Sequence, residues 1–199
     1  MIPEHKKLNM GCGFKKLNNF WNVDFNKNCN PDEVVDFETT PFPWEDNFFD
    51  EILADNCIEH LGQSPKKFSE IIREMYRISS TDSMWTIIVP HHRCDNYWDD
   101  FTHVRTITEN TFKHFDRKMN LENIKNNIGA STHGLNYDLD LEVIDVKYDI
   151  TYPFRNKLES GIIGNMQLNI DLNTMNNVAE RVTIFIKVHK PIRYKNGIL

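Results

Sequence analysis

The chain has 199 residues, a length at which one hydrophobic core forms without the support of disulfides or metals. Apolar residues make up 40% of it and aromatic residues 12%, which excludes a disordered chain. No apolar run approaches the roughly 20 residues of a membrane-spanning helix, and the formal charge of 23 − 29 = −6 disfavours phosphate polymers as ligands. We therefore expect a single domain over residues 1–199, with no membrane as partner and nucleic acid disfavoured.

The cysteines and the N-terminus indicate the compartment. The four cysteines contain no CxxC pair, and Met1–Lys7 lacks the charged-then-apolar pattern of a signal peptide. Both observations favour a reducing, cytoplasmic compartment. The oligomeric state stays open between a monomer and a homodimer.

Short strands dominate the first third of the chain. The apolar run 7–10 predicts a strand that ends in Gly11-Cys12-Gly13. Three further strands are predicted at 20–25, 33–37 and 48–55, and each of the four ends in polar or acidic residues or in the glycine pair.

A helix and a buried strand follow. Ser64-Pro65 is typical of a helix start, apolar residues then repeat with the helical period as far as Tyr76, and Ser79–Asp82 is the expected stop. The continuous apolar run 84–89, which Pro90 ends, predicts a central strand buried on both faces.

The last part of the chain predicts a short helix near Thr108–Phe115 and then a pair of strands. The strands, Leu141–Ile150 and Val182–His189, are β-branched and alternating, and the variable insertion 151–181 separates them. Strands that alternate with helices and end in a strand pair predict an α/β sheet with an antiparallel edge.

The glycine pair indicates the kind of ligand. Glycine after a strand lets the backbone approach a ligand closely, but Lys16 stands where a dinucleotide fingerprint needs a third glycine, and no phosphate-binding Gly-Lys-Ser/Thr follows. Asp24 ends the next strand, where a carboxylate can accept both hydroxyl protons of a ribose. The spacing of 24 − 13 = 11 residues leaves little room for a helix between the two strands.

The other strand ends supply further acceptors. Asp36 could accept from an adenine amino group, and Asp55-Asn56 would face the same crevice, because ligands of open α/β sheets bind at the carboxyl ends of the strands. The ligand that these residues favour is an adenosine with a cationic tail that carries no phosphate.

Together these segments resemble a known family. The chain is similar, from Lys7 to Phe115, to the class I S-adenosylmethionine-dependent methyltransferases, type 11 branch. The segments that carry the resemblance are Leu8-Asn9-Met10-Gly11-Cys12-Gly13, Asn22-Val23-Asp24, Asp36-Phe37-Glu38, Pro41-Phe42-Pro43, Phe48-Phe49-Asp50-Glu51-Ile52 and Ile58-Glu59-His60-Leu61.

The resemblance implies a Rossmann-like three-layer α/β sandwich whose seven-stranded, mostly parallel sheet has an antiparallel last strand, here with a shortened first crossover. It also implies S-adenosylmethionine as the cofactor. In similar proteins, the residues at Gly11 and Gly13 lie against the methionine and ribose, and the one at Asp24 holds the ribose hydroxyls. Those at Asp36 and Phe37 frame the adenine, and the end of the fourth strand with His60 lies near the methionine. The implied cofactor-binding residues are Asn9, Gly11, Cys12, Gly13, Asp24, Asp36, Phe37, Asp55, Asn56 and His60.

The sequence departs from the family before the fifth strand. Where the family commonly has Lys-Pro-Gly-Gly, this chain has Ser79-Ser80-Thr81-Asp82. We therefore expect Asx or Ser/Thr hydrogen bonds to build the turn.

The loop 91–105 is dense in acid–base groups. Methyl transfer is an in-line displacement, so the protein chiefly aligns the acceptor and removes its proton. His103 is the candidate base, Asp99 or Asp100 could orient its ring, and His92 is the reserve. The loop's three aromatic residues could line an acceptor pocket or contact a positively charged methyl donor, and these are Tyr97, Trp98 and Phe101.

A metal site in this loop and a cysteine nucleophile at Cys12 are two other possible interpretations. The residues His91, His92, Cys94 and His103 are metal-ligand types, but their spacing matches no common zinc pattern, so no metal is expected. Cys12 is interpreted as a small residue that the turn accommodates, because no basic neighbour lowers its pKa.

The sequence thus predicts a methyltransferase that acts on an oxygen or nitrogen of a small molecule or biosynthetic intermediate. The loop 91–105 and the insertion 151–181 would recognise the acceptor. Two alternatives stay open: a non-catalytic or regulatory S-adenosylmethionine-binding protein, and an enzyme that uses this cofactor for different chemistry.

Overall fold

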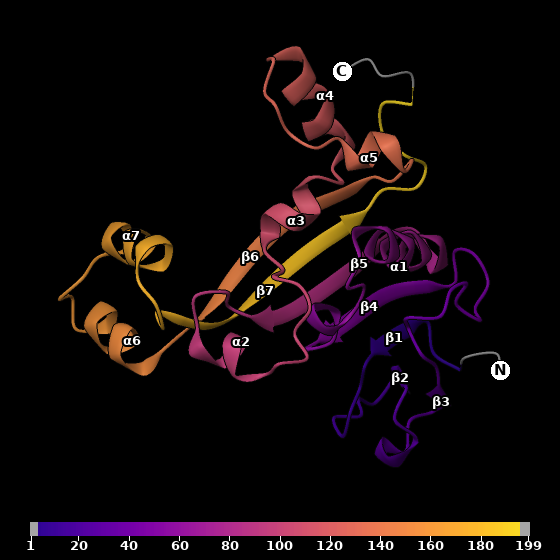
Figure 1. Cartoon of the computed structure of the whole chain (residues 1–199), viewed down its shortest axis with the longest axis horizontal. Coiled ribbons are helices and arrows are strands. Elements are labelled where there is room, and N and C mark those ends of the chain that lie inside the picture. The colour runs from indigo at the N-terminus through magenta and orange to yellow at the C-terminus, as the bar shows by residue number, and fades with distance from the viewer. Residues whose placement is uncertain (1–3, 196–199) are drawn as a thin grey trace.

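One sheet of seven strands organises the protein in a computed structural model that describes residues 4–195; residues 1–3 and 196–199, the ends of the expected domain, lie outside the described residues. The strands are β1 (Lys7–Met10), β2 (Trp21–Asp24), β3 (Glu33–Val34), β4 (Phe49–Asp55), β5 (Ser79–Pro90), β6 (Leu141–Ile150) and β7 (Ala179–Val188). Their order is β3-β2-β1-β4-β5-β7-β6, and β7 runs antiparallel to both of its neighbours (Figure 1). This confirms the predicted sheet and its antiparallel last strand.

The helices are unevenly distributed along the chain. They are α1 (Pro65–Ile78), α2 (Asp95–Asp99), α3 (Glu109–Lys113), α4 (Arg117–Lys125), α5 (His133–Asn136), α6 (Tyr152–Glu159), α7 (Asn165–Thr174) and the single 3-10 turns η1 (Lys27–Cys29) and η2 (Ile58–His60). Every α-helix of the described chain follows β4. This confirms the shortened first crossover, from β1 to β2, and the connections from β2 to β3 and from β3 to β4 also contain no α-helix. No helix in residues 4–195 is both long and apolar enough to cross a membrane.

Local side-chain hydrogen bonds define both ends of α1. The Ser64 side chain accepts from the Lys67 N–H at 3.2 Å at the start of the helix. At its end, Ser79 Oγ donates to the Met75 carbonyl at 2.7 Å and accepts from Trp85 Nε1 at 2.8 Å. The turn is therefore built by serine hydrogen bonds, although the segment expected as a stop already forms the first residues of β5.

The two faces of the sheet are buried to different degrees. Ile52, Trp85 and Ile186 lie side by side in register and are fully buried in the core beneath the helices. On the other face Leu53 and Thr86 are in register and only half-buried. The expectation that β5 is buried on both faces is therefore wrong for one face, because the helix-free connections between β1 and β4 leave it thinly covered.

The stretch between the last two strands is helical. β6 has the predicted bounds, whereas β7 begins three residues before the predicted start, within the expected insertion. The insertion folds as α6 and α7 at one end of the strand pair (Figure 1). Phe154, Leu168 and Leu172 pack with the start of β7 to form a second, small apolar cluster.

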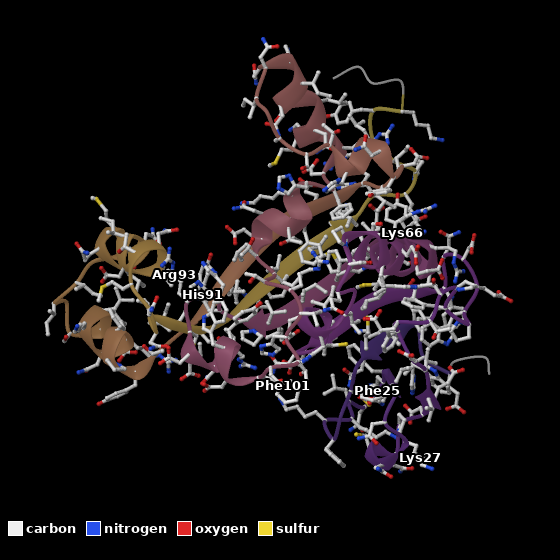
Figure 2. All side chains as sticks on the ribbon, in the orientation of Figure 1. Phe25, Lys27, Lys66, His91, Arg93 and Phe101 are labelled. Atoms are coloured by element: carbon white, nitrogen blue, oxygen red, sulfur yellow. The ribbon has the colours of Figure 1, made fainter. Side chains whose placement is uncertain are left out.

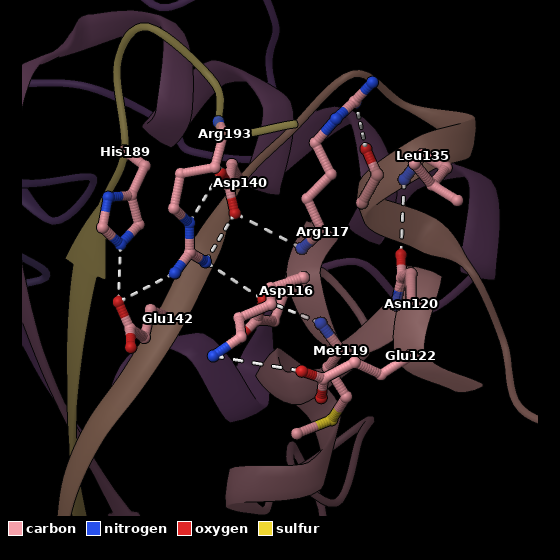
Figure 3. Close-up of polar contacts among 12 residues, drawn as sticks. Asp116, Arg117, Met119, Asn120, Glu122, Leu135, Asp140, Glu142, His189 and Arg193 are labelled. Atoms are coloured by element: carbon pink, nitrogen blue, oxygen red, sulfur yellow. Dashed lines mark hydrogen bonds and ion pairs between the residues drawn. The ribbon is translucent and has the colours of Figure 1, made fainter. Parts of the chain in front are cut away.

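A charged cluster joins the end of the chain to the sheet. Arg193 donates through Nη2 to Asp140 Oδ1 at 2.8 Å and to Asp116 Oδ1 at 3.0 Å, and through Nη1 to Glu142 Oε2 at 3.1 Å (Figure 3). Asp140 has no exposed surface and precedes β6, while Asp116 is the N-cap of α4. One guanidinium thus holds three segments together.

Replacing Arg193 by methionine should lower the free energy of unfolding by about 2 kcal/mol, since it leaves the buried Asp140 without its counter-charge. Urea denaturation at neutral pH measures the loss. The matched control is Arg73→Met at an exposed position of α1, which should change stability by less than about 0.5 kcal/mol. Equal effects of the two substitutions would show that the cluster contributes no stability.

Candidate functional site

A cavity of about 660 Å³ lies at the carboxyl ends of the parallel strands. Its lining is Gly11, Gly13, Asp24, Phe25, Asp36, Phe37, Glu38, Asn56, Cys57, His60, Leu61 and Thr102. Seven of the predicted site residues are therefore brought together here: Gly11, Gly13, Asp24, Asp36, Phe37, Asn56 and His60. The remaining predicted residues lie elsewhere and are described below.

The two glycines serve different purposes in the loop after β1. Both have positive φ, +68° at Gly11 and +50° at Gly13. A Cβ on Gly11 would stand 2.5 Å from Cys57 Sγ, whereas a Cβ on Gly13 would meet nothing within 4 Å. Gly11 therefore permits close packing of two loops, and Gly13 leaves open space on the cavity side.

Asp24 is fixed in orientation by the backbone around it. Its Oδ2 accepts from the Gly13 N–H at 2.8 Å and its Oδ1 from the Asn26 N–H at 2.8 Å. Each carboxylate oxygen can accept a second hydrogen bond. The carboxylate is thus held in one orientation, and each of its oxygens can accept one more hydrogen bond.

The segment after β3 forms another part of the wall. Asp36 is exposed, and its Oδ1 accepts from the Glu38 N–H at 2.9 Å. The Phe37 ring packs edge-on against Phe42, with centroids 5.4 Å apart, so its side chain belongs to the core as well as to the lining. Glu38 Oε1 accepts from the Gly62 N–H at 2.6 Å and joins this segment to the loop after η2.

Phe25 was not predicted as a site residue. It follows Asp24, lines the cavity and is 75% exposed. Figure 2 shows Phe25 and Phe101 in the lower half of the view. The apolar, exposed side chain next to a strand-end aspartate was the available signal.

Three predicted cofactor residues do not line the cavity. Asn9 is buried, and its Nδ2 donates to Asn22 Oδ1 at 2.9 Å and to the Lys15 carbonyl at 3.0 Å, so it positions the glycine loop. The Cys12 thiol is buried too, and burial raises its pKa to about 11, which agrees with a packing role. Asp55 shares its face of the sheet with Ile88 and points toward the ammonium of Lys15, 3.6 Å away.

His92, the reserve base, also lies outside the cavity. It contacts His91, with ring centroids 4.5 Å apart, in a separate hollow of about 270 Å³ that α7 helps to line. The path of the chain after Pro90 explains the difference, because the His91 N–H donates to the Glu180 carbonyl at 2.8 Å and holds this segment beside β7. His92 is therefore not proposed as a base.

Asp100 acts on a histidine other than the predicted one. Its Oδ1 accepts from the Thr102 hydroxyl at 2.6 Å, and that hydroxyl oxygen lies 2.9 Å from His60 Nδ1. Because the single hydroxyl proton goes to Asp100, the His60 Nδ1 carries a proton and donates it to Thr102. The expected pairing of Asp100 with His103 is thus replaced by a chain from Asp100 through Thr102 to His60.

His103 lies beside His60 and is oriented by a carbonyl. Its Nδ1 is 2.6 Å from the Tyr97 carbonyl, so Nδ1 carries the proton and Nε2 has a free lone pair. Its ring stacks on Tyr97 at 5.1 Å and is 4.7 Å from the His60 ring. The other two aromatic residues of this loop, Trp98 and Phe101, are on the surface, with 71% and 95% of their area exposed.

Glu59 is the most unusual group near the cavity. It has no exposed surface, and neither of its carboxylate oxygens has a hydrogen-bond partner among the described residues. Burial raises the pKa of Glu59 to about 7, partly offset by the residue's own backbone N–H and assisted by the negative charges of Asp55 and Asp100. In the sequence, Glu59 stands within the segment Ile58-Glu59-His60-Leu61, and no pattern there indicates a role for its side chain.

His91, in the separate hollow that it shares with His92, should make the fold sensitive to acid. Burial, together with His92 and Arg93, lowers the pKa of His91 from 6.5 to about 4. Stability from this group is complete above its unfolded pKa and is lost as the pH falls from about 6.5 toward 4, because the unfolded chain takes up the proton first. We measure the free energy of unfolding in urea near pH 7.5 and near pH 5. Its decrease between the two pH values should be about 2 kcal/mol smaller in His91→Asn than in the wild type. Equal losses would contradict this assignment.

The strand order and the location of the cavity define a class I methyltransferase fold. Solved structures share it over most of the chain. A SAM-dependent methyltransferase from Archaeoglobus fulgidus matches with a TM-score of 0.54 and 17% identity, over 94% of this chain and 87% of that chain. The YcgJ protein from Bacillus subtilis matches with a TM-score of 0.53 and 15% identity, over 94% of this chain and 92% of that chain. An S-adenosylmethionine-dependent methyltransferase from Mesorhizobium loti matches with a TM-score of 0.50 and 10% identity, over 94% of this chain and 92% of that chain.

These identities establish the fold alone. No protein-family model matches the sequence, and no curated protein sequence matches it either.

Proposed function

We propose that the protein is an S-adenosylmethionine-dependent methyltransferase that methylates an oxygen or nitrogen of a small molecule. The observation that carries the proposal is the braced carboxylate of Asp24 beside the open backbone at Gly13, at the strand ends of a methyltransferase fold. Two hydroxyls of a ribose match the two oxygens that this carboxylate offers.

The charge of the cavity supports the same ligand. The residues that line it include the carboxylates of Asp24, Asp36 and Glu38, and no lysine or arginine is among these described lining residues. A phosphate-bearing nucleotide would be repelled by such a wall, whereas a sulfonium cation would be attracted. The cavity therefore favours the phosphate-free cofactor over NAD or ATP.

Two histidines could serve an acceptor here. His60 lines the cavity, and the His103 ring lies 4.7 Å from the His60 ring. The Nδ1 of each ring is hydrogen-bonded, which leaves Nε2 to accept a proton. Holding the acceptor in line with the S–CH3 bond is the main task of the protein in such a displacement. The histidines would take the acceptor's proton as the new bond forms.

Incubation with S-adenosylmethionine labelled in its methyl group and a panel of hydroxyl- and amino-bearing metabolites tests the proposal. Mass spectrometry should detect label in an acceptor together with S-adenosylhomocysteine. Tight binding of the cofactor without any transfer would favour the non-catalytic alternative, and cofactor cleavage without a methylated product would favour different chemistry.

A further inference from the structure

We propose that Glu59, His60 and His103 bind a divalent transition-metal ion, such as Zn²⁺ or Mn²⁺, beside the cofactor cavity. One carboxylate oxygen and one ring nitrogen from each histidine all lie within 4.8 Å of one another. Two imidazoles with one carboxylate are a donor set that such ions prefer, whereas Mg²⁺ and Ca²⁺ prefer oxygen ligands alone. Bonds of about 2.1 Å would draw the three atoms together by about 1 Å.

The histidines are held as metal-binding histidines usually are. The Nδ1 of His103 bonds the Tyr97 carbonyl at 2.6 Å, and the Nδ1 of His60 bonds the Thr102 hydroxyl at 2.9 Å, which in turn donates to Asp100. Such outer hydrogen bonds fix the tautomer and turn the Nε2 lone pair toward the metal. Both Nε2 atoms are therefore available as ligands.

The burial of Glu59 gives a second, independent reason. Whether charged or protonated, a buried carboxyl group without a hydrogen-bond partner is costly, and a cation bound to its oxygens removes that cost. The guanidinium of Arg105 does not serve, since it donates to the Gly62 carbonyl at 2.6 Å and lies over the Phe68 ring. A divalent ion would satisfy both the charge and the lone pairs.

The backbone already joins the two segments that supply the ligands. The carbonyl of Glu59 accepts from the Val104 N–H at 3.0 Å and from the Arg105 N–H at 3.2 Å. The loop that carries His103 is thereby fixed to the turn that carries Glu59 and His60, although 43 residues separate the two histidines, as 103 − 60 = 43. The two segments that carry the ligands are thus held together before any ion binds.

The position of the site indicates its use, a step that rests on the proposed function. Three protein ligands leave coordination positions open, and His60 places them beside the cavity. The class of acceptor that fits is a hydroxyl compound whose oxygen binds the ion. With the ion bound, the two histidines are its ligands and no longer act as bases: the ion lowers the pKa of the hydroxyl, whose proton passes to solvent. The oxygen then forms the bond to the methyl carbon, and the S–CH3 bond breaks to leave a neutral thioether.

Metal binding to the full-length protein, stripped with a chelator, tests the site directly. Titration with Co²⁺, followed by its visible absorption, and with Zn²⁺, followed by calorimetry, should each show one ion per chain. Glu59→Gln and His103→Gln should weaken Zn²⁺ binding at least about 100-fold, while the matched controls Glu122→Gln and His114→Gln should leave it unchanged. Absence of stoichiometric binding, or equal affinity in all four variants, would overturn the proposal.

Two further measurements keep the result clear. If a ligand variant fails to fold, anomalous diffraction from Zn²⁺-soaked wild-type crystals decides: a peak among the three side chains supports the site, and a peak only elsewhere overturns it. S-adenosylhomocysteine binding is measured in parallel on the stripped protein. Its failure would remove the proposed function and leave the metal site intact, whereas failure of metal binding alone would leave the cofactor proposal intact.

Discussion

Replacing Asp24 by alanine is expected to weaken S-adenosylmethionine binding about 100-fold or more. The substitution removes two charge-assisted hydrogen bonds to the ribose, each contributing about 1.5–3 kcal/mol. It also releases the N–H groups of Gly13 and Asn26 that the carboxylate now orders. Calorimetric titration of the variant with S-adenosylhomocysteine measures the loss.

The matched control is Asp145→Ala, at an exposed position of β6, the strand at the edge of the sheet opposite to β3. It should bind like the wild type. Asp24→Asn keeps one acceptor oxygen and should fall between the two, which separates a lost ligand contact from a lost fold. Wild-type affinity in a folded Asp24→Ala variant would show that the cavity does not hold a ribose at this carboxylate.

Alanine at Gly11 is expected to cost about 3 kcal/mol of stability, and alanine at Gly13 only about 1 kcal/mol. Both positions have positive φ, so both substitutions carry the backbone penalty. Only at Gly11 does the added Cβ also meet Cys57, with Sγ at 2.5 Å and Cβ at 2.8 Å. Thermal and urea unfolding of the two variants measure the difference.

Each glycine variant is the control for the other, because both glycines lie in the same loop and both have positive φ. Gly13→Ala should remain well folded and show its effect in cofactor binding, since its methyl group enters the open side of the loop. Equal destabilisation at the two sites would mean that Cys57 can move aside, and that the close approach of the two loops is not a requirement of the fold.

Much of this architecture is predictable because local patterns decide it. β1 and β6 have the predicted bounds, and α1 begins at the predicted Ser64-Pro65 signal. The glycine pair and Asp24 could be read as neighbours, since strand ends of a parallel sheet meet at one edge. Alternation and helix capping act over a few residues, so the sequence displays them.

Other features depend on contacts that no local pattern reveals. The helices α6 and α7 lie in an asparagine-rich stretch and are stabilised by packing on the start of β7. The connection of Asp100 to His60 passes through Thr102 and joins segments 40 residues apart, as 100 − 60 = 40. Likewise, Glu59 gained significance only when the fold showed its carboxylate to be buried and unpartnered.

The most direct test of the central claim is a calorimetric titration of the purified protein with S-adenosylhomocysteine, supported by the shift in melting temperature. The proposed site predicts one molecule bound per chain, a melting temperature that rises with the logarithm of the ligand concentration above Kd, and loss of both effects in Asp24→Ala. No heat of binding and no thermal shift at millimolar ligand would contradict the assignment of this cavity as a cofactor site.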